Sequence, residues 1–302
     1  MRNPDDDRLI WTFATGPKKY QTMAKALAIS LDLQQCNIPR GLITDSDDPE
    51  LHSYFDVVSK PVPGYEHWFI KLAALDAFPE KYKRLIFVDG DSLAIQKLDG
   101  IFDCFEGHAF AVSCHWKTPE DNPDFDWYGD CMRVVKQLGF PRIPTFNAGF
   151  MYYERSDRTR ELFKRTLEFR DQFDGFGLVR NQGQIGDDIC ISFAMMDTGI
   201  GTGFRHDLDF AMTPYSLQGS VHLDVLKGEC SFIKGLGDPK LIKPLIYHTA
   251  HARWDLKYWR EVNRLLALDR RSKGGPPDAL LRFRKPMIVL TNWYQKLTGL
   301  NK

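Results

Sequence analysis

The sequence predicts an α/β fold built on a mixed, mostly parallel central sheet. Short apolar runs alternate along the chain with longer segments of helical periodicity, which is typical of βα units. The run Leu85–Val88 is apolar at every position, as in a strand that is buried on both faces. Two carboxylates, Asp89 and Asp91, follow this strand directly. Because ligands bind at the carboxyl ends of the strands in open α/β sheets, the same segment also predicts the place of a functional site.

The length suits one large α/β domain or two smaller ones, and the composition is sufficient for a sizeable core. The chain has 302 residues, of which 43% are hydrophobic. We expect the domain over residues 1–270 and a C-terminal helical tail over 271–302, because the stretch 273–277 is rich in glycine and proline. The formal net charge is zero, which gives the whole molecule no bias toward nucleic acid.

The charge is unevenly distributed along the chain. From residue 253 onward, 12 Lys and Arg stand against 4 Asp and Glu, a net charge of +8, so the preceding residues carry −8. A basic tail on an acidic body suggests an anionic partner for the tail, such as a lipid surface or phosphates.

The first half of the chain reads as three βα-like segments followed by the acidic strand. Leu9–Thr15 is expected as a strand that ends at a Gly16-Pro17 turn. The helix after it, Tyr20–Leu33, carries small and aliphatic residues on one face at spacings of three and four. Further apolar runs and helical spacing give the next elements, which are strands Gly41–Thr44 and Phe55–Ser59, helix Trp68–Phe78 and strand Leu85–Val88.

In the second half of the chain the alternation of strand-like and helix-like segments is less regular, and a polar, aromatic loop over Pro119–Tyr128 interrupts it. A last helix over 278–297 contains Pro286, which we expect to kink or split it. The other elements expected from the same patterns are strands His108–His115, Phe146–Tyr153, Leu208–Thr213 and Leu245–His248, and helices Arg158–Phe173, Asp187–Met196 and Trp254–Leu266.

Asp89 and Asp91 form a candidate metal site. Side chains at positions i and i+2 of an extended segment point the same way, so the two carboxylates can converge on one cation. Gly90 between them lets the backbone pass close to a ligand. Two hard oxygen ligands suit Mg²⁺ or Mn²⁺, which commonly bridge substrate phosphates. The alternative is a solvated turn after the strand, since aspartate and glycine favour turns in any case.

Four segments, in this order, resemble the family 8 glycosyltransferases: Thr12–Tyr20, Lys71–Asp103, Phe146–Met151 and Ile246–Ala250. They look like that family's first strand and nucleotide-binding turn, its lysine helix and DxD strand, its FN(S/A)G strand, and its segment with a third metal ligand. The likeness covers about residues 8–255. It implies a single GT-A (Rossmann-like) domain and a retaining transfer from a nucleotide sugar, usually a UDP-linked one.

The resemblance implies that Asp89, Asp91 and His248 coordinate Mn²⁺ or Mg²⁺. Oxygen and imidazole ligands together suit Mn²⁺ somewhat better than Mg²⁺. The metal would act as a Lewis acid on the diphosphate as the bond between sugar and oxygen breaks. Taken alone, His248 would read as an ordinary core or interface histidine.

The same resemblance implies which residues contact the donor and the sugar. The donor-binding set is Ala14, Thr15, Tyr20, Lys71, Gly90 and Arg253, and the catalytic set is Lys71, Asn147, Asp187 and Asp188. Tyr20 would stack on the base, and Lys71 would contact the phosphate or sugar of the donor. Local alternatives remain open: a packed tyrosine at a helix start, a solvated helix lysine, an asparagine that only satisfies a turn, and an N-cap at Asp187.

The chain departs from the family pattern in three places. One extra residue stands between Thr15 and Tyr20, which puts the stacking role of Tyr20 in doubt. Asp188 stands where the family usually has glutamine, so we assign no nucleophile: a carboxylate there would either stabilise an oxocarbenium-like transition state or attack in a double displacement. After His248, His251 replaces a glycine, and Arg253 stands in for a lysine on the β-phosphate.

The expected function is a metal-dependent, retaining transfer of a hexose from UDP-glucose or UDP-galactose to a hydroxyl acceptor. The acceptor would be a glycan, a polyol or a lipid-linked sugar, and a homodimer is left open. One alternative is a haloacid-dehalogenase-like phosphatase with Asp89 as nucleophile and Asp91 as acid–base, although three βα-like segments precede this motif. The other is a protein that binds nucleotide sugars without turnover.

The six cysteines show no CxxC pair, and several lie in apolar runs, as expected of buried thiols in a reduced, intracellular protein. The sequence shows no cleavable signal pattern and no apolar run of about 18 residues. We therefore expect a cytoplasmic protein. The basic and bulky apolar residues of 278–297 suggest peripheral contact with the inner face of a membrane, the alternative being a helix packed on the domain.

Overall fold

The chain forms two units in the computed structural model, which describes residues 6–120, 128–204, 211–212, 217–235, 239–249, 252 and 255–274. The first unit takes in the described residues of Met1–Gly16, Asn37–Asp89 and Asp99–Phe210. The second takes in those of Pro17–Cys36, Gly90–Leu98 and Ala211–Lys302.

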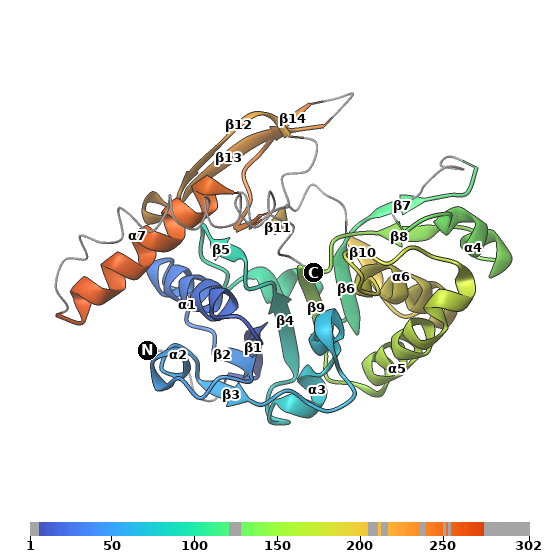
Figure 1. The fold of residues 1–302 in the computed structure, drawn as a ribbon, viewed down its shortest axis with the longest axis horizontal. Coiled ribbons are helices and arrows are strands. Elements are labelled where there is room, and N and C mark those ends of the chain that lie inside the picture. The colour runs from blue at the N-terminus through green and yellow to red at the C-terminus, as the bar shows by residue number, and fades with distance from the viewer. Residues whose placement is uncertain are drawn as a thin grey trace, which may run out of the picture. The chain divides into compact units, whose positions relative to one another are not determined.

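The first unit is built on a seven-stranded sheet with the order β10-β6-β9-β4-β1-β2-β3 (Figure 1). Strand β9 runs antiparallel to both of its neighbours, β4 and β6, and the other pairs are parallel. This confirms the predicted mixed, mostly parallel sheet. The strands are β1 (Arg8–Ala14), β2 (Arg40–Thr44), β3 (Val57–Ser59), β4 (Arg84–Val88), β6 (Phe110–Ser113), β9 (Phe150–Glu154) and β10 (Thr202–Phe204).

Strands β1 and β4 lie at the centre of this sheet, and their apolar side chains form its core. Residues Leu85 to Val88 of β4 are fully buried, as the apolar run predicted. The ring of Trp11 on β1 packs against Phe87 on β4, with centroids 4.8 Å apart, and edge-on against Phe78. A core of this kind fixes the end of β4, where the acidic segment begins.

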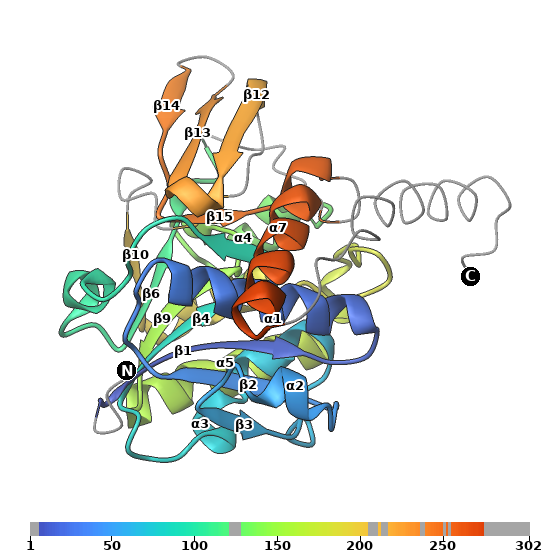
Figure 2. The ribbon, with the colours of Figure 1, turned by 90° about the vertical axis from the view of Figure 1, so that its left-hand side faces the viewer.

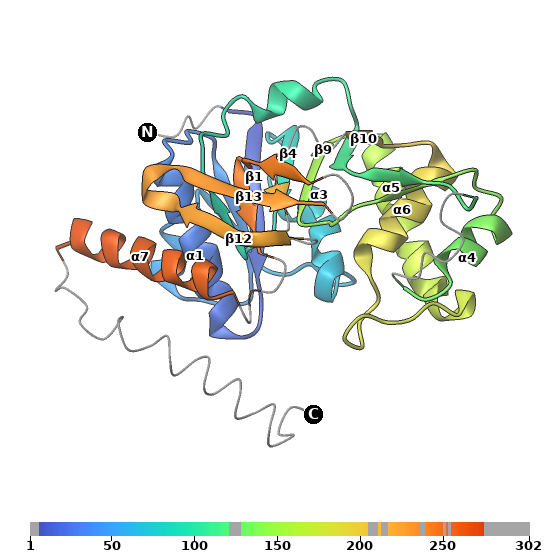
Figure 3. The same ribbon diagram turned by 90° about the horizontal axis from the view of Figure 1, so that it is seen from above.

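Helices of the first unit flank the sheet, and two of them pack side by side (Figure 3). These are α5 (Asp157–Gln172), which Ser156 caps by accepting from the N–H of Thr159, and α6 (Asp187–Thr198). The remaining elements are α2 (Pro49–His52), η1 (His67–Leu72), α3 (Ala74–Ala77), η2 (Ile101–Phe105), α4 (Cys131–Gln137), η3 (Phe173–Phe176) and the antiparallel pair β7 (His115–Lys117) and β8 (Ile143–Thr145).

The second unit pairs helix α1 (Lys18–Leu33) with helix α7 (Leu256–Ser272), which lie against each other (Figure 2). The predicted apolar face of α1 is confirmed, because its residues from Ala24 to Leu31 are buried apart from Lys25. Two small sheets complete the unit, β11-β15-β5 and β12-β13-β14. Their strands are β5 (Ser92–Ala94), β11 (Ala211–Met212), β12 (Leu217–Asp224), β13 (Glu229–Lys234), β14 (Lys240–Ile242) and β15 (Ile246–His248), with the turn η5 (Val225–Lys227).

Several predicted elements differ from the structure. The helix expected over Trp68–Phe78 is split into η1 and α3 at Ala73, whose N–H bonds to the carbonyl of Ile70 in a tighter turn. The strand expected over His108–His115 is divided between β6 and β7. The strand expected over Phe146–Tyr153 begins only at Phe150, because the residues before it form a turn.

Other elements had no sequence signal or fall outside the described residues. Strand β5 is only three residues long, and the first four residues of β12 are exposed. Neither strand therefore shows a clear apolar pattern in the sequence. Of the strand expected over Leu208–Thr213, Ala211 and Met212 form β11 and the rest lies outside the described residues. The tail helix expected over 278–297 lies outside them entirely.

All six cysteines are free thiols, and five of them are buried, as expected from their apolar surroundings. In the part of the chain that the structure describes, none of the helices combines the length and the apolar content that crossing a bilayer requires.

Candidate functional site

The end of β4 lies beside the turn that precedes β9. Because β9 runs antiparallel to β4, Phe150 at its start pairs with Val88 at the end of β4. The N–H of Asp89 donates to the carbonyl of Gly149 at 2.9 Å, and the N–H of Gly149 donates to Oδ1 of Asn147 at 2.8 Å. Asn147 therefore does make a local turn, as the alternative interpretation held. A contact of Asn147 with a sugar stays a prediction.

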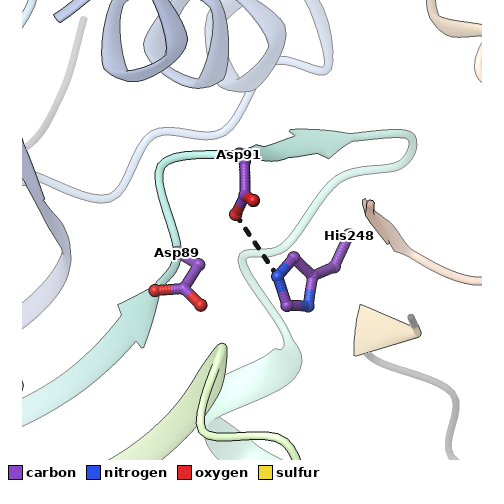
Figure 4. Close-up of side chains that lie close together, drawn as sticks. All are labelled: Asp89, Asp91 and His248. Carbon is purple, nitrogen blue, oxygen red and sulfur yellow. Dashed lines mark ion pairs between the residues drawn. The ribbon is translucent and has the colours of Figure 1, made fainter. Parts of the chain in front are cut away.

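A second strand pair brings Asp91 and His248 together. Strand β5 starts directly after Asp91, and β15 ends at His248, which pairs with Ser92 in the antiparallel register. The N–H of Thr249 donates to the carbonyl of Asp91 at 3.4 Å. As a result, Nε2 of His248 lies 3.3 Å from Oδ1 of Asp91 (Figure 4), and the imidazole is only 7% exposed.

Asp89 stands two residues before Asp91 in the chain and completes a group of three candidate metal ligands. Ligand atoms of Asp89, Asp91 and His248 all lie within 4.8 Å of one another (Figure 4). Two carboxylates and one imidazole are a donor set that fits a divalent ion such as Mn²⁺. The residues that the sequence predicted as ligands are thus brought together by the register of two strand pairs.

Lys71 lies behind Asp89 as a buried cation. Its Nζ is 2.9 Å from Oδ2 of Asp187 and 3.6 Å from Oδ1 of Asp89, and its side chain is 6% exposed. Burial by itself would lower the pKa of Lys71, but the negative charges of Asp187 and Asp89 outweigh it and raise the pKa above its usual value. Lys71 is therefore charged, and the alternative of a solvated helix lysine is wrong.

Asp187 is the first residue of α6, but it does not cap that helix. Gly186 occupies the N-cap position with no side-chain bond, and the carboxylate of Asp187 turns to Lys71 instead. The alternative of an N-cap at Asp187 is therefore wrong. A carboxylate in the first turn is still favoured by the helix dipole.

Asp188 is held by two donors. Its Oδ1 accepts from the hydroxyl of Tyr128 at 2.5 Å and from the N–H of Ile189 at 2.9 Å. Burial, followed by the charge of Asp187, raises the pKa of Asp188 to about 7. This carboxyl can therefore change its protonation state near neutral pH.

A small pocket opens beside Asp188. Its lining consists of Tyr128, Pro144, Thr145, Phe146, Asp188, Ile189 and Ser192. From the sequence, Tyr128 was expected in a specificity loop, where it could form a sugar platform or simply pack, and its bond to Asp188 was not predicted. It stands 60 positions from Asp188, so only the tertiary structure brings the two together.

The predicted donor-binding residues lie at element ends and surfaces. Ala14 is the buried last residue of β1, and Thr15 is half-buried after it. Gly16 follows with a φ of +78°, and its N–H donates to Asp45 at 2.9 Å, so the predicted turn is glycine-dependent. Tyr20, on α1, is 41% exposed.

Of the other two predicted donor contacts, Gly90 is described by the structure and Arg253 is not. The carbonyl of Gly90 accepts from the hydroxyl of Tyr258 at 3.5 Å, which ties the backbone at this point to α7. Arg253 and His251 lie outside the described residues.

No protein-family model matches the chain. Galactinol synthase 1 from Arabidopsis thaliana is 32% identical over 97 residues, which make up 29% of this chain. The chain spans 28% of the length of that relative.

Solved glycosyltransferase structures share the fold. The galactosyltransferase LgtC, crystallised with donor and acceptor sugar analogues, matches with a TM-score of 0.55 at 13% identity, covering 88% of this chain and 99% of that one. The glycosyltransferase GlyE from Streptococcus pneumoniae matches with a TM-score of 0.50 at 12% identity, over 90% of this chain and 66% of that one. The chain therefore has the GT-A fold, and the resemblance found in the sequence is confirmed for the fold and for one stretch of sequence.

Proposed function

We propose that this chain is a metal-dependent glycosyltransferase that moves a hexose from UDP-glucose or UDP-galactose to a hydroxyl acceptor with retention of configuration. The observation that carries the proposal is the group of Asp89, Asp91 and His248 at the end of the acidic strand. The shared GT-A fold and the stretch similar to a galactinol synthase support it.

Asp89, Asp91 and His248 would hold Mn²⁺, or Mg²⁺, together with the diphosphate of the donor. When bound, such an ion supplies Lewis-acid stabilisation of the leaving diphosphate. The carboxylates provide hard oxygen ligands, and the imidazole adds the nitrogen ligand that favours Mn²⁺.

Lys71 supplies a fixed positive charge to the donor. It is buried and held by Asp187 and Asp89, so it does not reorganise when a phosphate or sugar oxygen arrives. In the proposed complex Ala14 and Thr15 hold the nucleoside, and Tyr20 stacks on the base for about 1–3 kcal/mol. Gly90 keeps the backbone slim beside the ligand, and Arg253 contacts the β-phosphate.

Asn147, Asp187 and Asp188 are proposed to face the transferred sugar. Asn147 would bond a sugar hydroxyl. Asp187 is paired with Lys71, so its negative charge is already compensated, whereas Asp188 is held by neutral donors. Both roles remain proposed for Asp188, stabilisation of an oxocarbenium-like transition state and covalent attack on the anomeric carbon.

The experiment is a panel of UDP- and GDP-sugars with Mn²⁺, read as nucleotide release by slow hydrolysis. We expect release from a UDP-hexose, loss of release in excess chelator, and loss in Asp91→Asn with the fold intact. Full activity of Asp91→Asn, or activity in chelator, would contradict the metal assignment. Binding of the nucleotide sugar without any release would favour the non-catalytic alternative.

The phosphatase alternative has its own test. It requires a covalent phosphate on Asp89, so a phosphate analogue such as beryllium fluoride should be trapped there. The glycosyltransferase proposal expects no such trapping.

Peripheral membrane contact through 278–297 and a homodimer are further proposals. Flotation of the full chain with anionic liposomes, compared with a chain that ends after Lys273, tests the first. Equal, negligible flotation of both would remove it. The mass of the protein in solution tests the second.

A further inference from the structure

Tyr128 and Gly186 are fitted to each other beside the charged cluster. A Cβ placed on Gly186 would lie 2.5 Å from Cε1 and 2.6 Å from the hydroxyl oxygen of Tyr128, closer than real side chains approach. The glycine therefore leaves the space that the tyrosine ring occupies. The ring is fixed from other sides as well, edge-on to Phe173 and through the Tyr128 carbonyl, which accepts from the N–H of Val179 at 2.8 Å.

The hydroxyl of this clamped ring donates to Oδ1 of Asp188 at 2.5 Å. Tyr128 is 4% exposed and Asp188 is 8% exposed, so water does not compete strongly for the bond. Burial and the nearby charge of Asp188 raise the pKa of Tyr128, which keeps its hydroxyl protonated and a donor. Both residues line the same pocket.

We propose that Tyr128 is a positioning residue for the transfer reaction: its hydroxyl, placed by the space at Gly186, fixes the carboxyl of Asp188 at the edge of the pocket. The inference rests on the proposed function and adds a residue that the sequence motifs do not contain. Tyr128 acts through Asp188.

The bond also biases the protonation of Asp188. A donor to Oδ1 favours the ionised carboxylate, as do the charge of Lys71 and the N–H of Ile189, whereas burial and Asp187 favour the neutral acid. Two other titratable groups, the thiols of Cys131 and Cys190, lie close enough to interact with these carboxylates. Burial raises the pKa of both thiols, which keeps them neutral. Removal of the Tyr128 hydroxyl should therefore raise the pKa of Asp188.

The test is Tyr128→Phe, which keeps the ring and removes only the hydroxyl. We expect kcat for donor hydrolysis to fall about tenfold or more with little change in KM, as for loss of a hydrogen bond to a charged group. The limb of the pH profile that Asp188 controls should move to higher pH. The matched control is Tyr65→Phe, which removes the same kind of tyrosine-to-aspartate bond, to Asp76, on the surface.

A second readout does not depend on activity. The carboxyl carbon of Asp188, followed by ¹³C NMR against pH, should titrate at a higher midpoint in Tyr128→Phe and in Gly186→Ala than in the wild type. Tyr65→Phe and Gly175→Ala, where a Cβ meets open space, should leave the midpoint unchanged.

An unchanged midpoint in Tyr128→Phe would overturn the proposal, whatever the activity. A shifted midpoint in a protein that hydrolyses no nucleotide sugar would instead keep the Tyr128–Asp188 pair and reject the proposed function. A loss of activity with an unchanged midpoint would assign Tyr128 a packing role only.

Discussion

Lys71 is the residue on which the charge balance of the candidate site depends. Its ammonium group pairs with Asp187 and also faces Asp89, and all three groups are largely screened from water. A buried charge pair contributes little net stability compared with apolar residues, but removing one partner leaves the other charge buried and uncompensated.

We expect Lys71→Met to destabilise the fold by about 3–5 kcal/mol, because Asp187 would lose its partner. Urea unfolding at neutral pH measures the change. The matched control is Lys60→Met, which breaks the exposed pair with Asp47 and should change stability little. An equal effect of the two variants would show that burial does not determine the strength of the Lys71 pair.

At the level of elements, two antiparallel strand pairs position the candidate metal ligands. The start of β9 lies against the end of β4, and the end of β15 lies against the start of β5. A one-residue slip in either register would turn the side chains to the opposite face. Asp255, the N-cap of α7, links β15 to that helix.

Asp255 combines a capping role with a link to the strand of His248. Its carboxylate accepts from the N–H groups of Lys257 and Tyr258 and from the hydroxyls of Tyr247 and Thr249, which flank His248. The cap and the neighbours of the proposed ligand thus share one carboxylate.

We expect Asp255→Ala to cost about 1–2 kcal/mol in stability from the lost cap and, in addition, to weaken Mn²⁺ binding. Urea unfolding and calorimetric titration with Mn²⁺ measure the two effects. Asp130→Ala, which removes the N-cap of α4, serves as the control and should reduce stability without changing Mn²⁺ affinity. Unchanged Mn²⁺ affinity in Asp255→Ala would show that β15 holds His248 without this link.

Helices and strands were predicted best where the residues that pack into the core are those with apolar periodicity in the sequence. The predicted face of α1, with residues every three or four positions, is buried, and the apolar run Leu85–Val88 lies in β4, the central strand of the sheet. Prediction failed where a side chain overrides the pattern. Asn147 takes the N–H of Gly149 and delays β9, and the sequence around it still reads as a strand.

For the molecule as a whole, the metal proposal has a thermodynamic consequence. A ligand that binds only the folded state stabilises it by RT ln(1 + [L]/Kd), about 2.7 kcal/mol at one hundred times Kd. This effect requires neither a known sugar nor a known acceptor.

We therefore expect Mn²⁺ to raise the melting temperature of the full chain and a chelator to reverse the rise. Differential scanning calorimetry measures both. Asp91→Asn should show no rise, because one of the three ligands is lost, while Tyr65→Phe should respond like the wild type. A rise of the same size in Asp91→Asn would place the ion elsewhere on the molecule.

The sequence by itself determined the main strands of the central sheet, the long helices and the acidic end of β4, because apolar periodicity and short motifs are local properties of the chain. The third candidate ligand, His248, came from the resemblance to a family. The tertiary structure alone decided that Asp187 pairs with Lys71 instead of capping α6 and that Tyr128 donates to Asp188. These contacts join positions about 60 residues or more apart, and their energy comes from burial. Burial exists only once the chain has folded, so no local pattern encodes it.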